Sequence, residues 1–381
     1  MKKTIPYGHQ WIDEKDIKEV GLALRSDWIT QGPKVEEFEE KVSKFSGAKY
    51  GVAVSSGTTA LQLAYTAAGL GPRDEVITTP LTFVATSNAF VVLGAKPVFA
   101  DVKEESLNID PKEIEKKITK KTRALAVVDF AGFPCQYDEI LKIAKKHNLL
   151  IIEDASHALG SIYKGKRIGS IADMTILSFH PVKTITTGEG GMVLTNNKEF
   201  YESLKVLRHH SILKKPQKGT WYYEIEEPGY NFRLTDFQAA LGISQLQKLN
   251  KFIQRRREIV RKYNRAFGHI QEIITPPLEP KGVKAAWHIY VIQLVLEKLK
   301  ADRKKIFEDL HKEGIMVQVH YIPLHFQPFY KKKFGFKRGD FPKTENYYER
   351  AITLPLFPKM TNKEVEKVIE TVKKIINYYR L

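Results

Sequence analysis

Short apolar runs alternate with helical patterns from residue 50 to about residue 195. The apolar runs have the composition of buried strands, and the segments between them repeat apolar residues at the spacing of an amphipathic helix. This alternation is typical of a mostly parallel sheet with helices on both faces. We expect strands at YGVAVS, EVITT, PVFAD, ALAVVDF, LLIIED and TILSF (50–55, 75–79, 97–101, 124–130, 149–154 and 175–179) and helices in the segments that separate the first five.

The run GMVLTN at 191–196 follows the strand expected at 175–179 after a short loop. Because a parallel connection needs a crossover, usually a helix, we expect this strand to be antiparallel to a neighbour. The alternative architecture is a closed βα barrel, and the short loop between these two strands argues against it.

A second region follows a long helical pattern over 234–267. With 381 residues the chain exceeds the usual size of one hydrophobic core. We expect a large domain over 1–245 and a smaller α+β domain over 246–381. For the second region the pattern predicts strands at 287–296 and 315–321, helices at 302–314 and from about 362, and exposed loops at 214–230 and 322–344.

Composition excludes several classes of protein. With 43% hydrophobic and 28% charged residues the chain is expected to be globular and soluble, and no apolar run reaches the ~18 residues of a membrane span. The N-terminus has two lysines but no apolar core after them, which argues against a signal peptide. Cys135 is the only cysteine, so an internal disulfide is excluded and a reducing cytoplasm is favoured.

The formal charge of +17 does not by itself indicate nucleic-acid binding. Lys and Arg alternate with Glu along expected helices such as TNKEVEKVIETVKK, which is typical of solvated helix faces. Nucleic-acid binding predicts a basic stripe with interleaved aromatics instead. Attraction of an anionic small substrate is the alternative interpretation of the charge.

Metal and protease sites are not expected. The two histidines of HYIPLH (320–325) stand an odd number of residues apart on an extended segment, so they face opposite ways. His209 and His210 are adjacent, which is not a ligand spacing. The chain contains neither G-x-S-x-G nor H-E-x-x-H.

Four features follow ends of the expected strands. Asp154 ends LLIIED, at the edge where open α/β sheets bind ligands. AVSSGTTALQLA joins a strand to a helix through small residues, which favours anion binding by the helix N-terminus. Phe83 in TTPLTFVATSNA offers a flat apolar ring, and Lys183 in SFHPVKTITTGEGG offers an amine that becomes nucleophilic when desolvated.

Each feature has an ordinary structural explanation by itself, as a helix cap, a core aromatic or a surface lysine. Together they supply an anion seat, a stacking surface, a carboxylate and a reactive amine at one sheet edge. Pyridoxal 5'-phosphate (PLP) needs all four, for its phosphate, its ring, its pyridine nitrogen and its aldehyde. The combination therefore predicts a PLP site.

The motifs SSGTTALQLA, TTPLTFVATSNAF, IIEDASHALGS, SFHPVKTITTGEGG and GYNFRLTDFQAALGISQL together resemble the DegT/DnrJ/EryC1/StrS family of nucleotide-sugar aminotransferases. The resemblance runs from about Tyr7 to the terminal helix. It implies the PLP-dependent transferase fold of type I and a homodimer in which both chains contribute to each site.

The resemblance also implies roles for individual residues. Lys183 would bind covalently to the cofactor aldehyde, Asp154 would pair with the pyridine nitrogen and Phe83 would stack on the ring. His157 would lie near the phenolic oxygen of the ring or the substrate, and Asn231 would reach the cofactor phosphate of the neighbouring subunit. The phosphate would be held by Gly57, Thr58 and Ser178, and the sugar-nucleotide pocket would be lined by Tyr7, Asp27, Trp28, Ile29, Thr30, His180, His320 and Tyr321.

The motifs around His180, RHHSILKKP and VQVHYIP most resemble the pseudaminic acid branch of the family, which shares His180 where most members carry Asn. His210-Ser211 departs from the His-Gly typical of that branch. The resemblance implies transfer of the amino group of L-glutamate to C4 of a UDP-linked 4-keto-6-deoxy-N-acetyl hexose.

Three alternatives stay open at this point. The substrate could be another nucleotide-linked keto sugar, as in lipopolysaccharide or antibiotic biosynthesis. A sugar dehydratase of the same fold is a second, although those enzymes carry His in place of Lys183. A non-catalytic sensor of the same fold is the third.

Overall fold

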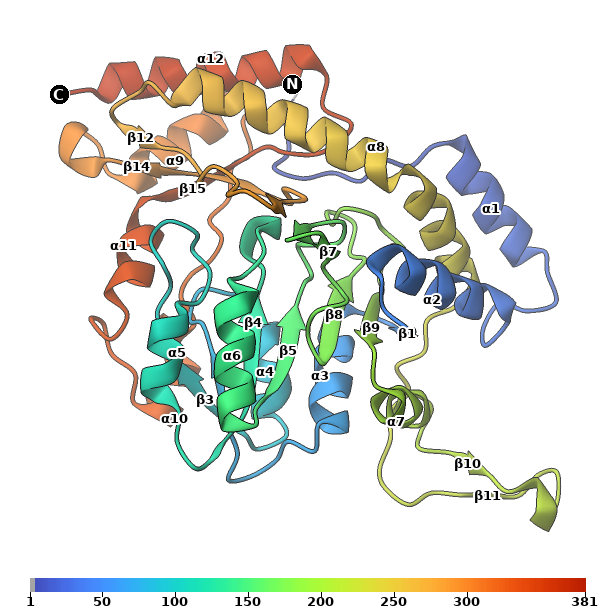
Figure 1. The fold of residues 1–381 in the computed structure, drawn as a ribbon. Coiled ribbons are helices and arrows are strands. Elements are labelled where there is room, and N and C mark those ends of the chain that lie inside the picture. The colour runs from blue at the N-terminus through green and yellow to red at the C-terminus, as the bar shows by residue number, and fades with distance from the viewer. Residues whose placement is uncertain (1–3) are drawn as a thin grey trace.

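The computed structural model describes residues 4–381, which form a central seven-stranded sheet covered by helices and a smaller sheet beside it (Figure 1). The strand order is β1-β9-β8-β5-β4-β2-β3. All neighbours are parallel except that β9 is antiparallel to both β1 and β8, which confirms the antiparallel strand and extends it to two partners. The strands are β1 (Tyr50–Val54), β2 (Glu75–Thr78), β3 (Lys96–Phe99), β4 (Thr122–Val128), β5 (Leu150–Asp154), β8 (Met174–Ser178) and β9 (Gly191–Thr195).

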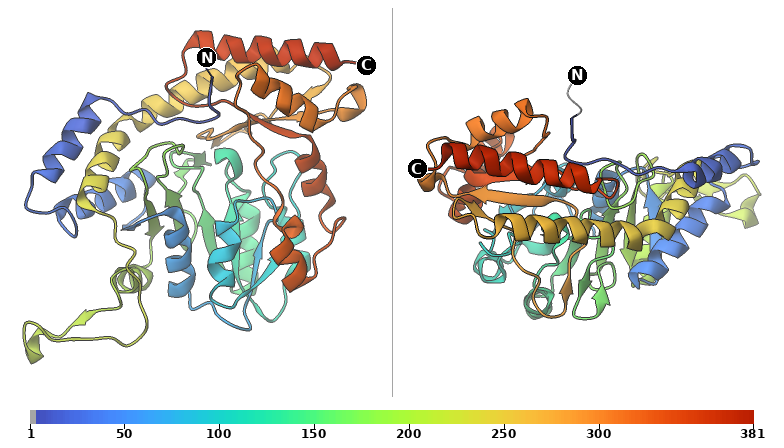
Figure 2. Two further views of the ribbon diagram at one scale, coloured as in Figure 1. Left: turned by 180° about the vertical axis from the view of Figure 1, so that it is seen from behind. Right: turned by 90° about the horizontal axis from the view of Figure 1, so that it is seen from above.

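Alternate side chains of these strands enter two separate cores. Val52 and Val54 belong to one core and Ala53 to the other, as the two-residue period of a strand requires. The two layers of helices lie on opposite faces of the sheet, and the α/β architecture predicted from the sequence is confirmed (Figure 2). One core includes α3 (Gly57–Ala67), α4 (Ala85–Val91) and α7 (Lys198–Arg208), and the other includes α2 (Pro33–Ser46), α5 (Pro111–Lys117), α6 (Tyr137–His147) and part of α8 (Asp236–Phe267).

The C-terminal region forms an antiparallel sheet of β12 (Ile273–Ile274), β14 (Tyr290–Leu294) and β15 (Ala351–Leu354). The helices α8, α9 (Arg303–Lys312) and α12 (Asn362–Tyr379) lie beside it (Figure 1). The division that we expect after residue 245 falls inside α8, and it stays a prediction.

Two expectations for this region are wrong. The segment 315–321 forms only isolated bridges, from Ile315 to Ile5 and from Gln318 to Thr353, so it is no strand. The segment 322–344 is not simply a loop, because it contains α10 (Pro328–Phe334) and the start of α11 (Pro342–Arg350). Each of these helices begins with proline, and α10 ends at Gly335 as its C-cap. These are ordinary start and stop signals of a helix, which we read as loop residues because the segment is rich in Pro and Gly.

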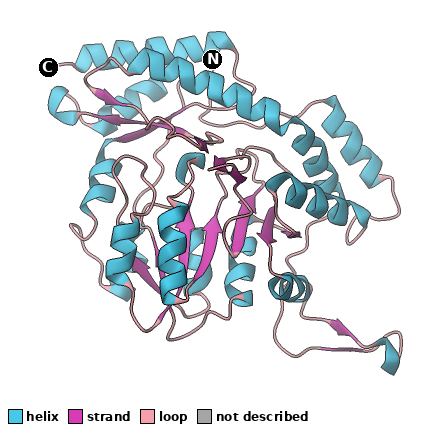
Figure 3. Cartoon of the chain, viewed as in Figure 1, coloured by secondary structure: helices cyan, strands magenta, loops and turns pink. Residues whose placement is uncertain are grey.

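An arm projects from the body of the chain between α7 and α8 (Figure 3). It contains β10 (Leu213–Lys214) paired with β11 (Tyr223–Glu224), and Trp221 at its end is 79% exposed. Within residues 4–381 we find no helix with the length and hydropathy of a membrane span. The remaining elements are α1 (Glu14–Leu24), β6 (Ile162–Tyr163), β7 (Lys166–Arg167), β13 (Val283–Lys284) and the 3-10 turns at Phe130–Gly132, Pro216–Lys218, Leu296–Lys298 and Leu324–Phe326.

Candidate active site

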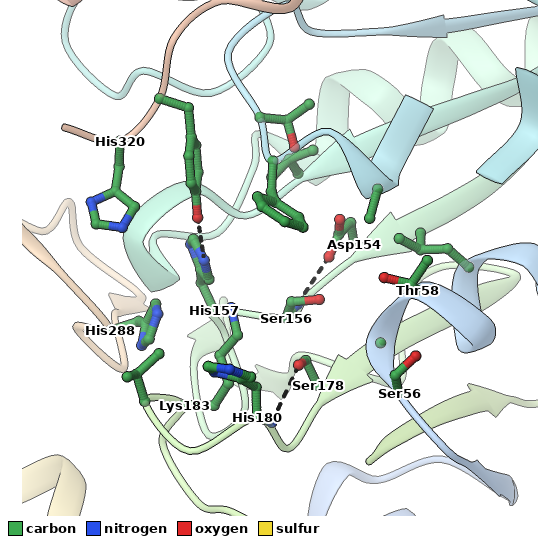
Figure 4. A pocket seen from close by; sticks show the side chains of 18 of the residues that line it. Ser56, Thr58, Asp154, Ser156, His157, Ser178, His180, Lys183, His288 and His320 are labelled. Carbon is green, nitrogen blue, oxygen red and sulfur yellow. Dashed lines mark hydrogen bonds between the residues drawn. The ribbon is translucent and has the colours of Figure 1, made fainter. Parts of the chain in front are cut away.

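A pocket of about 570 Å³ opens at the carboxyl ends of the central parallel strands. Val128 ends β4, Asp154 ends β5 and Ser178 ends β8, and all three line it. Side chains from these strand ends and from the loops around them point into the same space (Figure 4). The pocket brings together most of the residues singled out in the sequence, namely Tyr7, Gly57, Thr58, Phe83, Asp154, His157, Ser178, His180, Lys183, His320 and Tyr321.

Asp154 presents a buried carboxylate without a cation. Its Oδ2 accepts a hydrogen bond from Thr86 Oγ1 at 2.6 Å, and its Oδ1 accepts one from the amide of Ser156 at 3.2 Å. The residue is 7% exposed, and it forms no ion pair with any residue in 4–381. A buried carboxylate normally has a charged or multiple hydrogen-bonding partner, so this one is suited to a protonated nitrogen of a bound group.

The N-terminus of α3 faces the pocket beside Ser178. Ser56 caps the helix and accepts from the amide of Thr59, whereas the amides of Gly57 and Thr58 donate to no acceptor within residues 4–381. A Cβ on Gly57 would lie 2.9 Å from Ser178 Cβ, so only glycine lets the two backbones approach this closely. Free amides and the helix dipole make this corner suitable for a phosphate.

Lys183 carries the only amine or guanidinium that lines the pocket within the described chain. Burial lowers the pKa of its amine to about 8, and the charge of Asp154 opposes part of that shift. The pocket therefore holds an amine that is partly neutral near physiological pH.

Uncharged aromatic and imidazole groups form the opposite wall. Tyr321 Oη lies 3.1 Å from His157 Nε2, and His320 Nδ1 lies 2.8 Å from Thr353 Oγ1. Burial lowers the pKa of His157 well below its ordinary value and that of His320 to about 4, with the charge of Lys183 adding to both effects. Both imidazoles are thus neutral at pH 7.

Phe83 and His180 lie at the more exposed side of the pocket. Phe83 is 55% exposed, and the centroid of its ring is 5.9 Å from that of Tyr321. His180 is exposed, and its amide faces Ser178 Oγ at 3.5 Å. Both side chains are accessible to a ligand, and their roles stay predictions.

Five of the predicted residues lie outside the pocket of their own chain. Asn231 is exposed and pairs through its backbone with His209. The other four form an exposed segment held against the start of α8, where Ile29 O accepts the amide of Asp236. This segment comprises Asp27, Trp28, Ile29 and Thr30.

The pocket also contains residues that the sequence did not single out. His288 lines it, and its ring centroid is 4.3 Å from that of His157. The Nδ1 atoms of both rings are buried without a partner in the described chain. Thr86 does not line the pocket but donates to Asp154. It stands four residues after Thr82 in TTPLTFVATSNA, which is a weak signal for a second polar residue on that side, whereas nothing in WHIYVIQLVL marks His288.

These residues fit PLP. The carboxylate of Asp154, which has no ion-pair partner among the described residues, matches the ring nitrogen of the cofactor. The Lys183 amine, which burial partly neutralises, matches the aldehyde. The free amides beside Gly57 match the phosphate. Among residues 4–381 no group of three or more His, Cys, Asp or Glu side chains is placed to hold a metal ion.

Comparison with known proteins is consistent with this chemistry. The model of the DegT/DnrJ/EryC1/StrS aminotransferase family matches residues 10–373. Spore coat polysaccharide biosynthesis protein SpsC of Bacillus subtilis is 44% identical, over 98% of this chain and 97% of its own. UDP-4-amino-4,6-dideoxy-N-acetyl-beta-L-altrosamine transaminase of Campylobacter jejuni is 43% identical, with the same coverage.

Solved structures share the whole fold. PseC of Helicobacter pylori, an aminotransferase of pseudaminic acid biosynthesis, superposes with a TM-score of 0.93 at 36% identity, covering 99% of this chain and 100% of that one. Spr1654 of Streptococcus pneumoniae in its PLP form gives 0.93 at 34% identity, covering 98% and 99%.

Proposed function

The chain belongs to the DegT/DnrJ/EryC1/StrS aminotransferase family, and on that premise we propose that it is a PLP-dependent nucleotide-sugar aminotransferase. It transfers the amino group of L-glutamate to C4 of a UDP-linked 4-keto-6-deoxy-N-acetyl hexose. The products are 2-oxoglutarate and UDP-4-amino-4,6-dideoxy-N-acetyl-β-L-altrosamine. The relatives from Campylobacter and Helicobacter support this substrate, and the placement of Lys183 opposite Asp154 supports the chemistry.

One observation carries the proposal. Among the described residues, Lys183 is the one amine that lines the pocket; it is desolvated and shares the space with the buried carboxylate of Asp154, which forms no ion pair with them. PLP, when bound, supplies an electron sink that lets a proton leave the α-carbon of an amino acid. A sensor of the same fold would have no need for an amine with a lowered pKa.

The residues of the chain divide the work. Asp154 holds the ring nitrogen, Gly57 and Thr58 with Ser178 hold the phosphate, and Phe83 covers one face of the ring. His157, fixed by Tyr321, stays uncharged and orients the polar edge of the ring or the substrate. These contacts leave the Lys183 amine as the group placed to move protons.

Lys183 Nζ removes the proton from the α-carbon of glutamate and later delivers a proton to C4 of the sugar. A pKa of about 8 leaves about 10% of the amine neutral at pH 7, whereas an ordinary lysine would be about 0.03% neutral. Release of 2-oxoglutarate before the keto sugar binds makes the reaction ping-pong.

A panel of keto sugars tests the assignment. The enzyme with PLP and glutamate is incubated with UDP- and dTDP-linked keto sugars, and the product is identified by mass and NMR. Amination of a UDP-linked 4-keto-6-deoxy-N-acetyl hexose is expected. Reaction with a dTDP sugar alone would overturn the substrate, and no reaction with any of them would overturn the enzyme class.

A second candidate is an aminotransferase for another nucleotide-linked keto sugar. The 44% identity to SpsC supports this second candidate as strongly as the 43% identity to the Campylobacter enzyme supports the pseudaminic acid substrate. His180 in the pocket supports the pseudaminic branch, since the resemblance of the sequence to that branch includes this histidine.

We further propose a homodimer with shared sites in the cytoplasm. Asn231 and the segment 27–30, which the resemblance to the family assigns to the site, lie outside the pocket of their own chain. A second copy that brings Asn231 and the segment 27–30 to the pocket would also cover Trp28, which is 58% exposed. The free thiol of the buried Cys135 supports a reducing compartment.

Mixing two inactive variants tests the shared sites. Lys183→Ala and Asn231→Ala are each expected to be inactive or nearly so, and unfolding and refolding them together forms mixed dimers. If each site takes Lys183 from one chain and Asn231 from the other, the mixture recovers about a quarter of wild-type activity. No recovery in a sample that is dimeric by light scattering would show that the two residues act within one chain.

A further inference from the structure

A cluster of polar side chains lies buried beneath the sheet, on the face opposite the pocket, and takes no part in the proposed reaction. Glu153 stands next to Asp154 in β5, so its side chain points to the other face of the sheet. There it meets Asp129 from the end of β4, Tyr137 from the start of α6 and Thr175 from β8. All four residues are completely buried.

The hydrogen bonds of this cluster converge on one hydroxyl. Tyr137 Oη lies 2.9 Å from Asp129 Oδ1 and is also hydrogen-bonded to Glu153 Oε1. Thr175 Oγ1 donates to Glu153 Oε2 at 2.5 Å, and the amide of Cys135 donates to Asp129 Oδ1 at 2.8 Å. Asp129 Oδ2 is buried and meets no partner among the described residues.

Counting protons shows that the two carboxyl groups cannot both be ionised. Tyr137 has one hydroxyl proton and can donate it to only one of the two carboxyl oxygens. No lysine, arginine or histidine of residues 4–381 forms an ion pair with Asp129 or Glu153, so two charges would stand uncompensated. At least one further proton is therefore held between the two groups.

The electrostatics of the cluster agree with this count. Burial raises the pKa of both carboxyl groups, and the charge of Glu153 raises the pKa of Asp129 further. The other titratable groups that face the pair are Tyr137 and the thiol of Cys135, whose own pKa values burial raises. Neither supplies a positive charge.

The cluster is joined to the pocket through the loop 129–135. The amide of Asp129 donates to Asp154 O at 3.2 Å, and its carboxyl group closes the loop on the amide of Cys135. Within the loop, the ring of Phe130 is 6.4 Å from those of both His157 and Tyr321. The next carbonyl, of Ala131, accepts the amide of His288 at 2.9 Å.

We propose that Asp129, Tyr137 and Glu153 are positioning residues, which hold Asp154 and the loop 129–135 in place through a proton shared by two carboxyl groups. The inference rests on the proposed function, because the position of Asp154 and His157 matters only if they contact the cofactor or the substrate. The shared proton lets the two carboxyl groups stay in contact with Tyr137 without mutual repulsion, and so fixes the strand end that carries Asp154.

Two substitutions of Glu153 in the full chain separate shape from charge. Glu153→Gln keeps the shape and can donate to Asp129, so it is expected to bind PLP within about threefold of the wild type. Glu153→Ala opens a cavity beside Tyr137 and leaves the Thr175 hydroxyl without its acceptor, although Tyr137 still donates to Asp129. PLP binding is expected to weaken about tenfold or more. Apoenzyme is titrated with PLP by fluorescence quenching, and the absorption maximum of the bound cofactor is recorded.

Stability against pH reports the proton itself. A carboxyl group whose pKa is raised on folding contributes stability at low pH that is lost as pH rises through the folded-state pKa. The denaturation midpoint of the wild type should therefore fall as the pH rises above the ordinary range of carboxyl groups, and that of Glu153→Gln should fall less. The matched control is Glu345→Gln, a buried carboxyl group bonded to His325 outside this cluster, which is expected to leave PLP affinity unchanged.

The outcomes are distinct. The positioning role would be overturned if Glu153→Ala kept the PLP affinity and absorption maximum of the wild type. It would also be overturned if Glu153→Gln bound PLP as weakly as Glu153→Ala. If Glu153→Ala does not fold, Tyr137→Phe removes only the bridging hydroxyl, and unchanged PLP binding in that variant overturns the role equally. Failure of the proposed function looks different, because the wild type itself would then bind no PLP or aminate no sugar.

Discussion

Thr86→Val is the sharpest test of how the chain holds the ring nitrogen of its cofactor. Thr86 Oγ1 lies 2.6 Å from Asp154 Oδ2 and is the only side-chain donor to that carboxylate among the described residues. Valine has nearly the same shape, so it removes the hydroxyl without opening a cavity. Asp154 then keeps only the amide of Ser156, at 3.2 Å, as a protein donor.

The magnitude follows from the kind of bond that is lost. A hydrogen bond to a charged group contributes about 1.5–3 kcal/mol, and Asp154 is 7% exposed, so water replaces the donor poorly. If the bond orients the carboxylate for the bound ring, PLP affinity falls by about 10- to 150-fold. The Thr86 hydroxyl also lies 2.8 Å from Thr82 Oγ1, so part of the loss comes from the disturbed contact between the two threonines.

The assay is a titration of apoenzyme with PLP, followed by glutamate-dependent turnover at saturating PLP. Thr371→Val is the matched control, because its hydroxyl donates to Lys367 O within α12 and not to the pocket. That variant should bind PLP as the wild type does. If Thr86→Val bound PLP with wild-type affinity and turned over normally, Asp154 would not depend on this donor and the argument would be refuted.

Three further predictions concern the same pocket. Lys183→Ala should bind PLP but lose turnover entirely; appreciable activity of the folded variant would exclude Lys183 as the proton carrier. The rate at which apoenzyme combines with PLP should rise with pH and level off above about pH 8, the pKa of Lys183. Because the charge of Asp154 raises this pKa, Asp154→Asn should move the plateau to lower pH. A wild-type plateau near pH 10 would contradict the lowered pKa of Lys183. Gly57→Val should abolish PLP binding, since even a Cβ there would lie 2.9 Å from Ser178 Cβ, and unchanged binding would show that the phosphate lies elsewhere.

The fold and the floor of the pocket could be predicted from the sequence because both depend on local patterns. An apolar strand followed by a polar residue places that residue at the carboxyl edge of a parallel sheet wherever the strand stands in the order. Asp154 and Ser178 end their strands in this way, and Lys183 stands in the loop that follows β8. Their convergence needed no knowledge of the topology.

The supporting residues could not be predicted because their partners are distant in the sequence. Thr86 reaches Asp154 from α4, and His288 comes beside His157 from the strand region that follows α8. The same is true of Tyr137 and Glu153, whose separate motifs have the composition of an ordinary helix and strand. Periodicity reports which face a side chain takes, but not which side chain from another element meets it.

Residues 27–30 show a different relation between sequence and structure. The resemblance to the family predicts them in the sugar-nucleotide pocket, yet in the chain they lie on the surface with Trp28 58% and Ile29 51% exposed. Two adjacent large apolar side chains cost free energy in water, and Trp221 on the projecting arm is exposed as well. The predicted place of residues 27–30 in a pocket and their exposure in one chain agree if a second copy covers this segment and receives it at its own pocket. The family motif then carries information about assembly that the fold of one chain does not contain.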